Sequence, residues 1–230
     1  MKISELIKDN PYVGRGIVVG KSESGKACVA YFIMGRSENS RNRVFALENG
    51  ELFTRPYDAS KMKDPSLTIY RAIREINDLL IVTNGDQTDT VYEAIKSGGC
   101  FNRALKTRSF EPDAPHYTPR ISALLNLNDG NYKMSILKAE DEKGRACNRY
   151  LFDYEAVAGK GRFIHTYAGD GNPLPSFKGE PEEIDIPSSI DEFALDLWNG
   201  LNEANKISLY VRFIDTTNKT VEERLFNKNR

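Results

Sequence analysis

Three arginines lie within eight residues of one another in the stretch GRSENSRNR. They are Arg36, Arg41 and Arg43, and Ser37 and Asn42 add neutral donors beside them. A guanidinium presents two parallel N–H groups to the oxygens of a phosphate monoester, and hydroxyl and amide donors can serve the remaining oxygens. The pattern predicts a phosphate-binding loop. A solvated hairpin end has a similar composition, so that alternative stays open.

A second group of chemically useful residues lies in FEPDAPHYTPRI, residues 110–121. Three prolines stiffen a segment that carries Glu111, His116 and Arg120, and rigid segments hold acid–base groups well. An ordinary proline-stiffened connection is the alternative, and His116 by itself is more typical of a surface residue.

A third candidate is the turn in VTNGDQTD, where an apolar run ends at Asn84 and a helix is expected to start near Asp86 or Thr88. Free backbone N–H groups at a helix start can bind an anion or a polar ligand. Strand, Asn-Gly turn and helix is a common connection, however, and most such turns bind nothing.

Charge and composition exclude several partners. The 32 basic and 33 acidic residues leave a net charge of -1, which gives no basic field for nucleic acid or an anionic membrane. The longest apolar run, residues 27–34, is too short to span a bilayer. The arginines are therefore expected to act locally on a small anionic ligand.

The chain offers few metal-binding or cofactor-binding residues. Its three cysteines, Cys28, Cys100 and Cys147, are scattered, and His116 and His165 are its two histidines. We expect no disulfide framework, no metal site and a cytoplasmic location. Walker A, GxGxxG and GxSxG elements are absent from the sequence, so no cofactor is predicted.

These groups must be positioned mainly by strands. Strand-like patterns occupy residues 12–20, 26–34, 51–57, 66–76, 79–84, 121–127, 132–139, 148–156, 162–168 and 207–215. The first two flank KSESG, which predicts a hairpin. Residues 27–34 are continuously apolar rather than alternating, and this pattern is typical of a strand covered on both faces.

Helical periodicity is found in residues 86–99, which end in two glycines, and in residues 188–205, where Ser189 and Glu192 fit a capping box. Many strands with a few amphipathic helices predict an α+β layered sandwich. We expect one domain over residues 1–230, with residues 169–187 forming an ordered loop over a site.

In combination, four motifs make the sequence resemble the archaeal-type IMP cyclohydrolase family. They are YVGRGIVVGKSESGKACVAYFIMGRSENSRNR, TIYRAIR, VTNGDQTD and EPDAPHYTPRI, in order through the first 125 or so residues, with HTYAGDGNPLPSF matching more loosely. The resemblance implies a four-layer αββα sandwich like that of N-terminal-nucleophile hydrolases, but without an N-terminal nucleophile, since the sequence starts Met1-Lys2.

The same resemblance implies the reaction, in which formamidoimidazole carboxamide ribotide closes to inosine monophosphate (IMP) and loses water. The partner is then a small purine ribotide, no metal or cofactor is needed, and a homo-oligomer is left open. Matched motif by motif, the catalytic residues would be Tyr70, Glu111 and Arg120, and the substrate-binding residues Arg36, Ser37, Arg41, Asn42, Arg43, Asn84 and Thr88.

The loop between the RS and NR pairs is longer here than in the archaeal pattern, so Arg41 could stand in for Arg43, and a related ribotide could replace the expected one. Two other functions also stay open. One is an amide hydrolase on the same sandwich, which would need an N-terminal nucleophile released by cleavage before Ser4 or Cys28. The other is a purine-ribotide-binding protein without catalysis.

Overall fold

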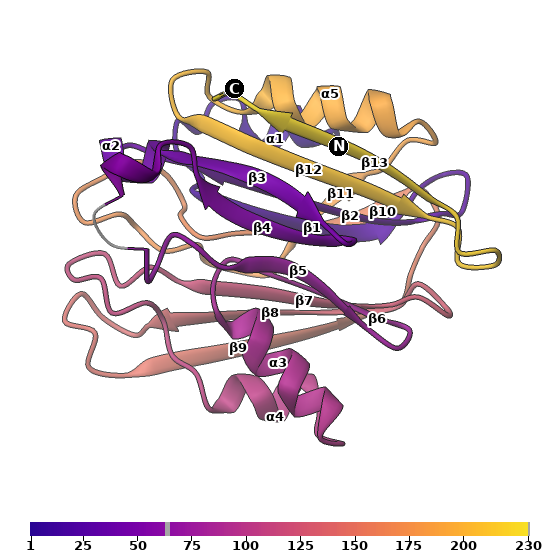
Figure 1. The fold of residues 1–230 in the computed structure, drawn as a ribbon, viewed down its shortest axis with the longest axis horizontal. Coiled ribbons are helices and arrows are strands. Elements are labelled where there is room, and N and C mark those ends of the chain that lie inside the picture. Colours follow the sequence, from indigo (N-terminus) through magenta and orange to yellow (C-terminus); the bar gives the residue numbers. More distant parts are fainter. Residues whose placement is uncertain (63–64, 230) are drawn as a thin grey trace.

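The chain folds into two antiparallel sheets that pack face to face, with helices on their outer faces (Figure 1). The structure is a computed structural model that describes residues 1–62 and 65–229. The fold is therefore α+β, and its layers run helix, sheet, sheet, helix. None of the helices in these described residues is long and apolar enough to cross a membrane.

The first sheet has the strand order β11-β10-β1-β2-β12-β13. Its strands are β1 (Arg15–Lys21), β2 (Ala27–Met34), β10 (Lys160–His165), β11 (Glu182–Asp185), β12 (Lys206–Ile214) and β13 (Val221–Asn227). Helices α1 (Ile3–Ile7) and α5 (Ile190–Gly200) cover its outer face. Phe193 and Leu197 of α5 join Phe32 and Leu209 of the sheet in one buried cluster.

The second sheet has the order β3-β4-β5-β6-β7-β8-β9. Its strands are β3 (Arg43–Glu48), β4 (Glu51–Pro56), β5 (Arg71–Ile76), β6 (Leu79–Thr83), β7 (Arg120–Asn126), β8 (Tyr132–Ala139) and β9 (Cys147–Tyr154). Helices α3 (Gln87–Lys96) and α4 (Phe101–Lys106) cover its outer face through a smaller apolar cluster. The short α2 (Glu38–Arg41) and a 3-10 turn (Ala59–Lys61) lie in connections.

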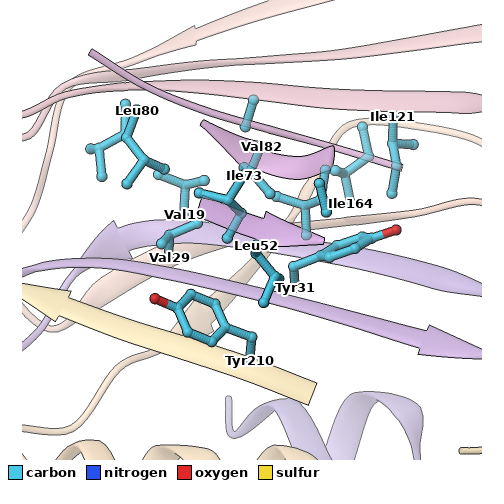
Figure 2. Close-up of a cluster of buried hydrophobic side chains, with 14 of the residues drawn as sticks. Val19, Val29, Tyr31, Leu52, Ile73, Leu80, Val82, Ile121, Ile164 and Tyr210 are labelled. Carbon is cyan, nitrogen blue, oxygen red and sulfur yellow. The ribbon is translucent and has the colours of Figure 1, made fainter. Parts of the chain in front are cut away.

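Strand β2 shows why its sequence is continuously apolar. All eight of its residues are buried. Val29 and Tyr31 face the interior between the sheets, where Figure 2 shows them among aliphatic side chains of both sheets, while Ala30 and Phe32 face the helix layer. Successive side chains of a strand point to opposite faces, so a strand with a layer on each side needs apolar residues throughout.

Most predicted elements are confirmed, including the β1–β2 hairpin and the helices at 86–99 and 188–205. Gly98, at φ +80°, follows the end of α3, and the Ser189 side chain accepts a hydrogen bond from the Glu192 N–H. The strand expected over 66–76 begins only at Arg71. Helices α1, α2 and α4 were not predicted, because four to six residues are too few to show a helical period.

Strand ends bring the candidate residues to one end of the sandwich. Arg15 opens β1 opposite the last residues of β2, and His165 closes β10 beside it. In the second sheet, Arg43 opens β3 and Arg120 opens β7. The Arg43 guanidinium of the second sheet donates to the Met34 carbonyl of the first at 3.1 Å, so these ends of the two sheets are in contact.

Candidate active site

A cavity of about 220 Å³ opens at this end of the sandwich. It is lined by the start of β1, the end of β2, the arginine loop, the proline-rich segment and the chain after β10, with the residues Tyr12, Gly14, Arg15, Met34, Arg36, Ser37, Ser40, Arg43, Thr68, Asp113, His116, Thr118, Tyr167 and Leu174. Of residues 169–187, expected to form an ordered loop over a site, the first part reaches the cavity, because Leu174 is in the wall and its N–H donates to His116 Nδ1 at 3.2 Å. The last part is not loop, because Glu182–Asp185 form strand β11.

Arg43 is the most buried cation of this wall. Its side chain is 2% exposed, with Nε donating to the Ser40 carbonyl at 2.7 Å and Nη2 donating to Met34. Nη1 has no hydrogen-bond partner, and no carboxylate of the described residues forms an ion pair with the guanidinium. Burial lowers the pKa of Arg43. A buried cation without a counter-charge is costly, so this group favours an anionic or carbonyl ligand.

Arg36 lies nearer the mouth of the cavity. It forms an ion pair with Asp170, donates to the Gly171 carbonyl at 3.0 Å and lies over the Tyr12 ring at 5.0 Å. Its partners come from the segment after β10, so this arginine connects that segment to the arginine loop. Ser37 is the N-cap of α2 and accepts from the Ser40 N–H at 3.1 Å.

The other two predicted residues of the arginine loop lie outside the cavity wall. Arg41 donates to the carbonyl of Gly35, directly after β2, and to Asn205 in the α5–β12 connection. Asn42 exchanges two hydrogen bonds of 2.8 Å with the backbone of Asp58. Of the two arginines that could serve the NR motif, Arg43 is therefore the one that faces the cavity.

Glu111 lies behind the wall, 2% exposed, and its Oε2 accepts from both terminal nitrogens of Arg15 at 3.4 Å. Its Oε1 has no partner. Burial raises the pKa of Glu111 to about 7, outweighing the nearby guanidinium of Arg15. A carboxyl group with that pKa can change its protonation state near neutral pH, which suits acid–base chemistry.

Tyr70 directly precedes β5, where its backbone pairs with Thr54 of β4. Its hydroxyl lies 2.7 Å from the hydroxyl of Tyr31, which comes from β2 in the opposite sheet. The charges of Arg15 and Arg43 both act on Tyr70, so it lies close to the cations that line the cavity.

Arg120 and Asn84 belong to a buried network beside these groups, and Thr88 bonds the Thr83 hydroxyl at 2.7 Å and the Gly85 carbonyl at 3.2 Å. None of these three predicted residues is in the cavity wall. Arg120 Nη1 donates to Gln87 Oε1 and forms an ion pair with Asp86, both at 2.7 Å. Asn84 donates to the Pro119 carbonyl and accepts from Ile121 N and Gln87 Nε2. This network fixes the end of the proline-rich segment to the start of α3.

Sequence reasoning named no role for Arg15, Tyr31 or Tyr167. Arg15 could have been noticed as a single charge at the start of an apolar strand, within the Gly-Arg pair of the first motif. Tyr31 carries no such signal, because a tyrosine within an apolar run usually indicates packing. Tyr167 lies in HTYAGDGNPLPSF, the segment that matched the family only loosely.

Comparison with known proteins decides the family. The model of the family described as IMP cyclohydrolase-like protein matches residues 12–219. The chain belongs to the IMP cyclohydrolase-like family. Relatives named IMP cyclohydrolase include that of Methanococcus maripaludis strain C7, 34% identical over 190 residues, covering 76% of this chain and 91% of the relative. The Methanocaldococcus jannaschii relative is 30% identical over 190 residues, covering 79% and 88%.

In this member of the IMP cyclohydrolase-like family, the cavity wall thus joins three predicted residues, Arg36, Ser37 and Arg43. Glu111 contacts the wall residue Arg15, and Tyr70 bonds Tyr31 in the interior between the sheets. Among the residues that the structure describes, no group of three or more His, Cys, Asp or Glu side chains could hold a metal ion. What the arrangement offers is donors, cations and one carboxyl group with a raised pKa.

Proposed function

We propose that the protein is an IMP cyclohydrolase, which closes formamidoimidazole carboxamide ribotide to IMP with loss of water. The observation that carries the proposal is Arg43 in the cavity wall of a chain from this family. Its buried guanidinium has one nitrogen without a partner and no carboxylate of the described residues within ion-pair distance. The ribotide phosphate, or an oxygen of the imidazole substituents, would supply the missing acceptor.

In the proposed binding mode, Arg36 and Arg43 hold the phosphate, and Ser37 contributes its hydroxyl. Arg36 would exchange the carboxylate of Asp170 for phosphate oxygens. Charge-assisted bonds from guanidinium groups to phosphate are among the stronger hydrogen bonds in proteins. Asn42, Asn84 and Thr88 hold the loops from behind. Arg41 turns away from the cavity and has no part in the proposed binding mode.

The chemical step needs a better nucleophile and a stabilised oxygen. The carboxamide nitrogen attacks the formyl carbon, and the new C–N bond leaves a hydroxyl on that carbon. The hydroxyl departs as water together with the proton of the former formamide nitrogen, and a C=N bond forms between that nitrogen and the carbon. Both groups are on one imidazole ring, so proximity is built into the substrate. Glu111 would accept the proton that the carboxamide nitrogen loses, and Tyr70 would donate a hydrogen bond or proton to the formyl oxygen.

Arg15 and Arg120 have supporting roles in this proposal. Arg15 contacts Oε2 of Glu111, which leaves Oε1 for the substrate. Arg120 holds the proline-rich segment that carries Glu111 against the start of α3.

The direct test mixes purified protein with enzymatically formylated ribotide and follows IMP by ultraviolet absorbance. Wild type should form IMP, and Glu111→Gln should lower kcat about 100-fold or more. Glu140→Gln is the matched control, because Glu140 is exposed at the end of β8. Tight binding of IMP without turnover would instead support a purine-ribotide-binding protein.

An amide hydrolase on the same sandwich is less compatible with the positions of its possible nucleophiles. Cys28 lies in the buried strand β2, where burial raises the pKa of the thiol well above its ordinary value. Ser4 is tied to Asp196 through both its hydroxyl and its N–H. The finer likeness, to an N-terminal-nucleophile sandwich used without its nucleophile, is part of our proposal. An intact-mass measurement of the purified chain should show no cleavage before Ser4 or Cys28.

A further inference from the structure

The interior between the two sheets holds a pair of tyrosine hydroxyls that the proposed reaction uses only in part. Tyr31 of β2 and Tyr70, which precedes β5, lie 2.7 Å apart, so one hydroxyl donates to the other across the two sheets. The direction of that bond decides where the proton of Tyr70 points.

The surroundings of Tyr31 settle the direction. Tyr31 is 0% exposed, its ring stacks on Phe45 at 5.4 Å, and its hydroxyl has Tyr70 as its hydrogen-bond partner. If Tyr70 were the donor, the proton of Tyr31 would lie in an apolar interior without an acceptor. A buried donor without a partner is costly. This cost favours Tyr31 as the donor to Tyr70.

Tyr70 is in a different position, because it is 7% exposed whereas Tyr31 is fully buried. The charges of Arg15 and Arg43 reach both tyrosines. Arginine side chains have only donors and cannot accept its proton. Arg15 and Arg43 line the cavity, and Tyr70 follows the lining residue Thr68 by two positions. A Tyr70 proton that is not donated to Tyr31 is available to an acceptor bound in that cavity. Burial also raises the pKa of Tyr31 well above its ordinary value, so Tyr31 keeps its proton at every pH at which the protein works.

We propose that Tyr31 is a positioning residue of the active site, which donates its hydroxyl proton to Tyr70 and thereby aims the Tyr70 proton at the substrate oxygen. This inference rests on the proposed role of Tyr70 in ring closure. The donated bond also polarises the Tyr70 O–H group, because hydrogen bonds in a chain strengthen one another in a low-dielectric interior.

The kinetic test is a double-mutant cycle. Tyr31→Phe keeps the ring and should lower kcat about five- to tenfold, the effect of one net hydrogen bond, with IMP affinity unchanged. In the Tyr70→Phe background the same change should lower kcat by less than about twofold, because Tyr31 acts only through Tyr70. Full kcat in Tyr31→Phe, or losses that multiply, would overturn the proposal.

Tyr210 provides a matched control, because it lies directly opposite Tyr31 in the β2–β12 pairing and is equally buried. Its hydroxyl bonds to Glu223 and Arg212, and Figure 2 shows it pointing away from the Tyr31 hydroxyl. Tyr210→Phe should leave kcat within about twofold of wild type. An equal fall of kcat in Tyr31→Phe and Tyr210→Phe would indicate general loosening of the core and contradict the proposal.

A second measurement does not depend on turnover. In protein labelled with ¹³C at tyrosine Cζ and dissolved in equal parts of H₂O and D₂O, a slowly exchanging hydroxyl splits its Cζ resonance into two signals. Tyr31 should give two signals and Tyr70 one, each assigned from its Phe variant. Two signals for Tyr70 would mean that its proton is held inside the protein, and the proposal would be wrong. Absence of wild-type turnover would instead count against the proposed function.

Discussion

Two buried residues of the site are incompletely paired, and they are chemically complementary. Arg43 has a terminal nitrogen without an acceptor, and Glu111 has a carboxylate oxygen without a donor. Leaving such a group unpaired costs about 1–3 kcal/mol, and more when it is charged. A ribotide offers both partners, since its phosphate accepts and its carboxamide donates. The same free energy would then be recovered on binding.

Replacing Arg43 with Ala should weaken IMP binding by about 2 kcal/mol, or roughly 30-fold, because a charge-assisted bond is lost. Arg43→Lys should recover only part of the affinity, since Lys lacks the planar fork. Calorimetric titration with IMP measures both. Arg41→Ala serves as the control, because Arg41 turns away from the cavity, and it should bind like wild type. If Arg41→Ala lost affinity and Arg43→Ala did not, the two arginines would have exchanged roles.

Turnover should rise with pH through about 7, because Glu111 must be ionised to accept a proton and burial places its pKa there. The pH dependence of kcat/KM measures this ionisation in the free enzyme. Glu111→Gln should lose the ascending limb together with most of the activity. An unchanged limb in the variant would assign the ionisation to another group.

The raised pKa also predicts how folding stability changes with pH. Between the pKa of an unfolded glutamate, about 4.3, and about 7, Glu111 is ionised in the unfolded chain but neutral in the folded one. The unfolded state then binds fewer protons, so this group lowers the free energy of unfolding as pH rises through that window. The free energy of unfolding of Glu111→Gln, minus that of wild type, should therefore be larger at pH 8 than at pH 5. Urea unfolding of both proteins at both pH values measures this difference. The same difference at pH 5 and pH 8 would contradict the burial of an ionisable group here.

At the scale of elements, the arginine loop owes its geometry to α2. This single turn separates the Arg36-Ser37 pair from the Asn42-Arg43 pair. Asn42 is the C-cap of the turn, and its side chain ties the exit of the loop to Asp58, so that β3 can begin at Arg43 with its side chain directed inward.

The turn between β6 and α3 is built around the buried amide of Asn84, which makes three hydrogen bonds to Pro119, Ile121 and Gln87. Asn84→Ala should lower the free energy of unfolding by about 2–3 kcal/mol, because these buried partners lose their bonds. Urea denaturation measures the loss. Asn102→Ala, on the exposed side of α4, should change stability by less than about 0.5 kcal/mol.

A different result would support Asn84 as a substrate-binding residue, the role that the sequence motif suggested. If Asn84→Ala folded as stably as wild type but no longer bound IMP, the amide would contact the substrate directly. Loss of stability with affinity largely kept assigns it to holding the turn.

At the scale of the whole molecule, the cavity lies where the ends of both sheets meet. The first sheet provides Arg15 and Met34, and the second provides Arg43, whose side chain bonds back to Met34. At another junction of the sheets, Asn227 of β13 bonds both the N–H and the carbonyl of Phe45 in β3. A ligand held by Arg15 and Arg43 would therefore bind both sheets at once.

Turnover should not depend on a metal ion, because the proposed ring closure uses only a carboxylate, a tyrosine and cations of the chain. Exhaustive dialysis against a chelator, followed by the IMP assay and metal analysis of the protein, tests this. We expect unchanged kcat. Activity that is lost on dialysis and restored by zinc or magnesium would overturn the mechanism and not the fold.

The sequence by itself determined the elements that depend on local pattern. The eight apolar residues of β2 predicted a layer on each face of that strand. Ser189 and an apolar stripe predicted α5, and glycine predicted the end of α3. Each of these signals acts within one helical turn or along one strand, so the local sequence is sufficient. The gathering of arginines in one loop, and of Glu111 and Arg120 in one stiff segment, was also visible in the chain.

Only the tertiary structure decided which of these residues meet. Tyr31 and Tyr70 are 39 positions apart, and Arg15 and Glu111 are 96 apart. Such contacts depend on strand order, register and the packing of one sheet on the other. The same packing turned Arg43 into the cavity and Arg41 away from it. The periodicity of a segment predicts which face of its strand or helix a side chain occupies. It does not predict which residue of another element that side chain will contact.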